Sequence, residues 1–353
     1  MTLHLRVGFL PLVDAALLVA AADAGFAEGR GLALELVRDV SWSNLRDRLH
    51  VRLLDAAHML APAAIASTLG IGGVTAPMAA PILLNLNGNA VTVSTCRFEE
   101  LARAADGDLA DGDLADPMVS ARALAKLVGM RKASGLPPLT FAAVFGFSSH
   151  TYLLCDWMAR GGVRLGQDVR FEVVPPVQTV EALRSGRIDG FCAGAPWNTL
   201  AVAAGVGAIL HCGVDLQADC PEKALAWRAD DVERRGEAVS RLNAALVDAS
   251  RWAGAETNWP RLAELLATPE RLGMPADLIE AILRGEIAQG GGRPVRPVAS
   301  YIRFDEKALR PEPGHADWLL AAMARAGQLV PELGMSERAR AVFRPAAFDL
   351  MLS

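Results

Sequence analysis

Few side chains in this sequence have the types and spacing that catalysis or metal binding requires. The sequence contains no GxSxG motif, no Walker loop and no GxGxxG segment after an expected strand, so no standard nucleophile or phosphate site is present. His58 follows an apolar run and is either a core residue or part of a site. The histidines without partners at ligand spacing are His4, His50, His211 and His315. We therefore expect no metal site and no cofactor.

An aspartate-rich stretch, AADGDLADGDLAD at 104–116, invites a calcium interpretation. Its spacing does not match the D-x-D-x-D-G loop with a glutamate at the twelfth position that calcium-binding loops of that class use. We expect a solvated surface insertion instead.

A ligand-binding loop is suggested by the stretch 173–198, VVPPVQTVEALRSGRIDGFCAGAPWN. It predicts a short strand, a helix from about Gln178 to Ser185 and a second strand, Ile188–Ala193. A Gly-Ala-Pro turn then presents Trp197 and Asn198. In open α/β sheets the loop after such a strand is where ligands usually bind. The alternative is an ordinary crossover with a buried Trp197.

The segments that must position this loop alternate between strand and helix. The pattern β-α-β-α-β predicts an α/β fold with mainly parallel sheets. Asp14 and Ser43 are the expected caps of the first two helices. The expected strands are Leu3–Leu10, Leu32–Val37, Leu53–Met59, Ala90–Ser94 and Leu139–Phe145. The expected helices are Asp14–Ala24, Asn44–Val51, Met118–Ala133 and His150–Arg160.

Six blocks of the sequence resemble, in order, the nitrate- and bicarbonate-binding proteins related to NrtA and CmpA. Besides 173–198 they are VGFLPLVDAALLVAAADAGF (7–26), VSWSNLRDRLHVRLLDAAHMLAPAAIA (40–66), LNLNGNAVTVS (84–94), SSHTYLLCDWMARGGV (148–163) and CPEKALAWR (220–228). The resemblance implies a two-lobed, periplasmic-binding-protein-like type II fold. In that fold the chain crosses between the lobes twice and the ligand lies in the cleft between them.

The resemblance also implies the domain division. Lobe one is expected to comprise 1–94, lobe two 95–199, and 200–353 to return to lobe one and add a helical C-terminal extension. Helical patterns dominate after residue 200, over 234–252, 259–266, 276–284 and 315–326. The proline-rich segment Gln289–Pro313 is expected to be ordered, poor in strands, and packed across lobe one.

Carried over residue by residue, the family's anion pocket falls on Trp42, Asn89, His150, Trp197 and Lys223. Asn89 departs from the glutamine of the nitrate binders but keeps an amide donor. Ala195 departs from the glutamate of many transport relatives, which leaves the role of its loop open. His58 and Gln178 are second-tier candidates for the same site.

The chemistry of these side chains suits a monovalent oxyanion. Nitrate has three acceptor oxygens and no donor, and the indole, amide, imidazole and ammonium groups of the pocket residues all donate. Lys223 supplies the charge, and His150 begins an expected helix whose free backbone N–H groups also favour an anion. Bicarbonate carries a hydroxyl and needs an acceptor as well. The pair His150 and Lys223 therefore favours nitrate or nitrite.

Composition and charge narrow the compartment and the partners. The 353 residues carry a net charge of −5, with 52% hydrophobic and 21% charged residues, which is typical of a soluble globular protein that binds no nucleic acid. No apolar run reaches the ~18–20 residues of a membrane span. Met1 leads directly into the first strand, and the five cysteines contain no CxxC pair. We therefore expect a cytoplasmic protein without a secretory signal.

The resemblance implies two functions that share one pocket. One is a cytoplasmic nitrate or nitrite sensor like the NasS proteins, which holds an RNA-binding antiterminator of the ANTAR class and releases it when the ligand binds. The other is the solute-binding component of an ABC importer for nitrate or bicarbonate. The expected lack of a signal peptide favours the sensor. An enzyme like the pyrimidine synthases of the same lobe architecture is a further alternative, but their CCCFC-type motif is absent.

Overall fold

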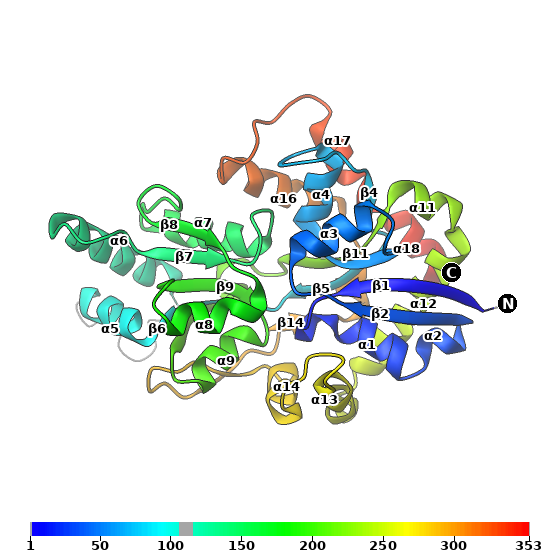
Figure 1. Ribbon diagram of the computed structural model, residues 1–353, viewed down its shortest axis with the longest axis horizontal. Helices are drawn as coiled ribbons and strands as arrows, with labels where there is room; N and C mark the ends of the chain where they lie inside the picture. Colours follow the sequence, from blue (N-terminus) through cyan, green and yellow to red (C-terminus); the bar gives the residue numbers. More distant parts are fainter. Residues whose placement is uncertain (1, 106–115, 353) are drawn as a thin grey trace.

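The computed structural model describes residues 2–105 and 116–352, which form two α/β lobes side by side (Figure 1). The aspartate-rich stretch that raised the question of calcium lies almost entirely outside these residues. No helix in the described part of the chain is long and apolar enough to cross a bilayer.

Lobe one is built on a seven-stranded sheet. β1 (Leu3–Phe9) lies in parallel between β2 (Leu32–Arg38) and β3 (Ala56–Leu60). The other strands are antiparallel to their neighbours: β11 (Pro221–Arg228), β5 (Leu83–Asn87), β4 (Met78–Ala79) and β14 (Ile302–Arg303). β5 leads into the second lobe and β11 returns from it. A strand that returns must run opposite to one that leaves, so the sheet is mixed rather than mainly parallel as predicted.

Helices cover both faces of this sheet (Figure 1). On one face lie α1 (Ala16–Asp23), α2 (Phe26–Gly29), α12 (Gly236–Ala253), α13 (Trp259–Ala267) and α14 (Ala276–Leu283). On the other face lie α3 (Trp42–His50), α4 (Ala61–Leu69), α16 (Pro313–Arg325) and α17 (Met335–Arg340). The remaining helices of the lobe are α11 (Ala229–Arg234), α15 (Glu306–Leu309) and α18 (Pro345–Leu352). α12 buries Val239, Leu242 and Leu246, whose spacing of three to four residues gives the helix one apolar face.

Lobe two contains a five-stranded sheet in the order β10-β6-β9-β7-β8. Its strands are β6 (Asn89–Ser94), β7 (Thr140–Ala143), β8 (Arg170–Val173), β9 (Gly190–Gly194) and β10 (Gly207–Cys212). Its helices are α5 (Thr95–Ala104), α6 (Pro117–Ala133), α7 (Ser149–Arg160), α8 (Thr179–Arg184), α9 (Trp197–Ala203) and α10 (Gly213–Leu216). By sheet membership β6 and β10 belong to lobe two, whereas the predicted division placed 1–94 and 200–353 with lobe one.

The C-terminal part packs on both lobes. Within Gln289–Pro313, β13 (Val295–Pro297) forms a hairpin with β12 (Glu286–Ala288), and β14 joins the sheet of lobe one. Farther on, α16 lies against α7 of lobe two, where Arg325 Nη2 is 2.9 Å from Asp156 Oδ2.

The two chain segments that connect the lobes are bonded to each other. Asn87, with φ of 62°, and Gly88, with φ of 96°, form the tight link between β5 and β6. The backbone N–H of Asn87 donates to Cys220 O at 2.9 Å, and Asn87 Oδ1 accepts from the N–H of Cys220 at 2.9 Å. The outgoing and returning segments therefore meet at one point.

Candidate functional site

Lys223 and Glu222 place two charged side chains inside the sheet of lobe one. β11 lies between β5 and β3 and is buried along its whole length. Lys223 Nζ donates to Asp14 Oδ2 at 2.7 Å and to Glu222 Oε1 at 2.5 Å. Burial opposes the ammonium charge, but the two carboxylates outweigh burial and raise the pKa of Lys223 above its usual value. Lys223 is therefore charged in the protein interior.

Asp14 has a different role from the helix cap that the sequence predicted. It lies in a 3-10 turn, Val13–Ala15, and its side chain makes no capping hydrogen bond. Its Oδ1 is 3.0 Å from His58 Nε2, an ion-pair distance without hydrogen-bond alignment. Burial acts to raise the pKa of Asp14, but Lys223 and His58 outweigh it and hold this pKa well below its usual range. The Asp14 carboxylate therefore binds the buried ammonium of Lys223 instead of capping the following helix.

Glu222 joins the two lobes. Its Oε2 accepts from Asn89 Nδ2 of β6 at 2.7 Å and from the hydroxyl of Ser149 at the start of α7. His150 Nε2 is 3.4 Å from Glu222 Oε1. Burial lowers the pKa of His150 to about 4, although Glu222 acts in the opposite direction, so the imidazole is neutral near pH 7. We call the set Asp14, His58, Asn89, Ser149, His150, Glu222 and Lys223 the buried charge cluster.

Of the two predicted pocket tryptophans, Trp42 lies beside the buried charge cluster. Trp42 begins α3 after Ser41, which accepts from Asn44 N and so replaces the expected cap Ser43. The Trp42 ring lies 5.3 Å from Lys223 Nζ and 5.6 Å from the ring of His58. The Nε1 atoms of Trp42 and Trp197 are buried and have no partner among the described residues.

The loop after β9 adjoins the buried charge cluster. A Cβ atom added at Gly194 would lie 3.3 Å from Asp14 Oδ2, so the backbone passes close to that carboxylate. Trp197 follows this loop and belongs to the same apolar core as Trp42. Gln178, a second-tier candidate, is exposed at the end of the 3-10 turn Pro176–Gln178.

The structure thus brings together four of the five predicted pocket residues, Trp42, Asn89, His150 and Lys223, and second-tier His58. The expectation of a pocket lined by donors alone is wrong. A buried ammonium needs counter-charges, which Asp14 and Glu222 supply, and the amide N–H of Asn89 is already used by Glu222. Sequence reasoning missed both carboxylates. The available signal was a pair of charges, Glu-Lys, at the start of the apolar strand that follows Cys220.

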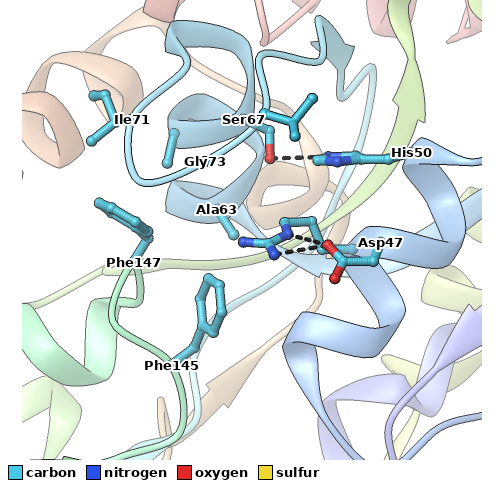
Figure 2. A pocket seen from close by; sticks show the side chains of 11 residues that line it. Asp47, His50, Ala63, Ser67, Ile71, Gly73, Phe145 and Phe147 are labelled. Carbon is cyan, nitrogen blue, oxygen red and sulfur yellow. Dashed lines mark hydrogen bonds and ion pairs between the residues drawn. The ribbon is translucent and has the colours of Figure 1, made fainter.

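A separate cavity of about 50 Å³ lies where the lobes meet (Figure 2). Phe145 and Phe147 of lobe two face His50 of α3 and Ser67 of α4, and His50 Nε2 is 3.3 Å from Ser67 Oγ. A Cβ atom at Gly72 would lie 2.5 Å from the Phe147 ring, so the lobes touch here too. The cavity adjoins α3, whose first residue is Trp42, but it contains none of the residues of the buried charge cluster.

Comparison with known proteins matches residues 2–267 to the model of the NMT1-like family. The chain is 31% identical over 350 residues to the nitrate import ATP-binding protein NrtC of Synechocystis, covering 98% of this chain and 49% of that protein. It is 30% identical over 279 residues to the bicarbonate transport ATP-binding protein CmpC of Synechococcus elongatus, covering 78% of this chain and 39% of that protein. The chain therefore spans half or less of these two relatives.

Among solved structures, the periplasmic nitrate-binding protein NrtA of Synechocystis superimposes with a TM-score of 0.87 at 25% sequence identity. The match covers 99% of this chain and 88% of that chain. This agreement confirms the predicted two-lobed fold of periplasmic solute-binding proteins.

Proposed function

The chain belongs to the NMT1-like family, and from this membership and the buried charge cluster we propose that it binds a small planar oxyanion, nitrate or bicarbonate, and is not an enzyme. Its relatives are named for nitrate import and for bicarbonate transport. We place the anion at the buried charge cluster, beside Lys223 and between the lobes.

The observation that carries this proposal is the set of buried donors without acceptors. Buried polar groups are almost always hydrogen-bonded, and an unpaired one points to a missing water or ion. The indole N–H of Trp42, beside Lys223, and the one N–H of the neutral His150 imidazole are buried without hydrogen-bond partners among the described residues. An oxyanion offers the acceptors that these groups lack.

Trp42→Phe tests the placement of the anion. We expect calorimetry to show nitrate or bicarbonate binding weakened at least tenfold, because a direct donor is lost. The free energy of unfolding should fall by only about 1–2 kcal/mol, the cost of the smaller ring, because the N–H has no hydrogen-bond partner among the described residues.

Trp227→Phe is the matched control for Trp42→Phe. Trp227 is also buried with an unpartnered Nε1, but it lies four residues beyond Lys223 on β11, roughly 13 Å away. Equal losses of affinity in the two variants would move the anion away from Trp42. No binding of nitrate, nitrite or bicarbonate to the wild type would reject the proposed function.

The role that the relatives favour is that of a solute-binding component for an importer. A second candidate is the nitrate or nitrite sensor expected from the sequence, located in the cytoplasm and partnered by an ANTAR-class antiterminator. It is supported by five free cysteines, Cys96, Cys155, Cys192, Cys212 and Cys220, which are typical of a reducing compartment.

The sensor predicts a protein complex that the ligand dissolves. Ligand-free protein should co-elute with an ANTAR-class antiterminator in size-exclusion chromatography, and saturating nitrate should separate them, because linked binding sites weaken each other by the same factor. A complex that is equally stable with and without nitrate, or that never forms, would leave the import component as the function.

A further inference from the structure

The carboxylate of Glu222 occupies the donors that the proposed oxyanion needs. Its Oε1 accepts from Lys223 Nζ at 2.5 Å, and its Oε2 accepts from Asn89 Nδ2 at 2.7 Å and from the Ser149 hydroxyl. These donors come from both lobes. A carboxylate is itself a planar group with negative charge on two oxygens, so Glu222 serves as an internal anion.

The charge of the cluster opposes a second anion. Asp14 and Glu222 contribute two carboxylates, and Lys223 contributes one ammonium within 2.7 Å of both. Glu222 accepts from three donors, the bonding pattern of an ionised carboxylate. With neutral histidines the cluster carries one net negative charge. An added nitrate would place like charges side by side in a buried site.

We propose that Glu222 determines which oxyanion binds and links binding to protons. An anion without a proton of its own, such as nitrate, binds together with one proton taken up by His150, which lies 3.4 Å from Glu222. Bicarbonate instead donates its own hydroxyl to Glu222 and needs no added proton. This inference rests on the proposed function.

The surroundings of His150 identify it as the place for the proton. The charged groups that act on His150 are Glu222, Lys223 and Asp14. His58 faces Asp14 and not Glu222 at contact distance. Other polar groups of α7 and of two helices packed against it have partners of their own: Asp156 pairs with Arg325 of α16, Asp215 of α10 pairs with Arg296, and Tyr152 OH donates to Gln328. The basic residues of α6 are not among the charges that act on His150.

His150 is also in a suitable state to receive a proton. Burial holds its pKa at about 4 in the ligand-free protein, so it is neutral near pH 7. A nearby anion raises the pKa of an imidazole. At a pH between the pKa of His150 in the ligand-free protein and its pKa in the nitrate-bound protein, nitrate affinity changes by up to tenfold per pH unit. Binding is tighter at lower pH.

Calorimetry in buffers of different ionisation enthalpy measures directly how many protons the protein takes up when the anion binds. We expect the wild type to take up about one proton per nitrate at pH 7, and nitrate affinity to fall about tenfold per pH unit from pH 6 to 8. Bicarbonate, titrated in a sealed cell at pH 8, should bind without proton uptake. These measurements need no variant and so do not depend on the folding of one.

Glu222→Gln identifies the residue responsible. The variant removes the charge and keeps the size, so His150 faces one anion instead of two. Nitrate should then bind with less proton uptake, with a weaker pH dependence, and at least tenfold more tightly than in the wild type at pH 8. Glu172→Gln, which changes a glutamate of lobe two paired with Arg187 at 2.9 Å, is the matched control and should behave as the wild type.

Two results would overturn the inference: nitrate binding to the wild type without proton uptake, or unchanged proton uptake in Glu222→Gln. Both leave the proposed function standing, because an anion still binds. The absence of binding for nitrate, nitrite and bicarbonate alike would reject the proposed function and this inference together.

Discussion

Replacing Lys223 with methionine should lower the free energy of unfolding by about 3–5 kcal/mol and abolish oxyanion binding. Methionine fills a similar volume, so packing is largely kept. The ammonium, however, holds Asp14 and Glu222 at 2.7 and 2.5 Å. Without it two buried carboxylates would face each other uncompensated. Urea denaturation of the ligand-free variant measures the loss.

A triple variant separates the role of charge from that of packing. Lys223→Met combined with Asp14→Asn and Glu222→Gln removes all three charges and should recover most of the lost stability, because no uncompensated charge stays buried. It should not recover binding. If Lys223→Met alone is as stable as the wild type, the carboxylates are not the ionised partners described here.

Stability should fall steeply as the pH drops from about 6 to 5, because three buried histidines resist protonation. Burial lowers the pKa of His150 to about 4, that of His211 to about 3, and that of His58 below its usual value. In the unfolded chain each binds a proton below about pH 6.5. The unfolded state therefore binds more protons. His150 and His211 each remove about 1.4 kcal/mol of stability per pH unit, and His58 acts in the same direction.

His211→Asn tests, at a position away from the candidate site, whether buried histidines cause this loss of stability at low pH. His211 lies in lobe two, where its Nε2 is 2.5 Å from Ser120 Oγ and its ring is 6.0 Å from that of Trp157. The variant should lose about 1.4 kcal/mol per pH unit of the slope between pH 6 and 5, whatever it does to stability at pH 7. An unchanged slope, or a flat profile in the wild type, would contradict the prediction.

Much of the fold was predictable because local signals and tertiary packing agree. Ala133 ends both the predicted and the observed α6, and Asp116 caps this helix by accepting from Met118 N. The strand directions were not predictable in the same way. Whether β11 runs with or against β3 depends on the path through the second lobe, which no local pattern in Pro221–Arg228 records.

The candidate site could be predicted in its positions but not in its electrostatics. Trp42, Asn89, His150 and Lys223 were found by resemblance to a family, which transfers residue positions. The partners of Lys223 are set by three-dimensional proximity: Asp14 is 209 residues away in sequence. At the sequence level Asp14 fits a helix cap equally well, and only the position of β11 in the sheet, between β5 and β3, decides between the two roles.

The hydrogen-bonded pair Asn87 and Cys220 lies much closer to the candidate site than to the outer surfaces of the lobes. Asn89 and Glu222 lie two residues beyond the pair, roughly 7 Å at the rise of a strand. If the lobes rotate about this pair, a change of about 1 Å at that radius is a turn of about 8°. At roughly 30 Å, the diameter of a small domain, the same turn displaces the surface by about 4 Å. Two anions whose sizes differ by less than a bond length would therefore hold the lobes at different angles. A protein that touches both lobes would then meet two clearly different surfaces.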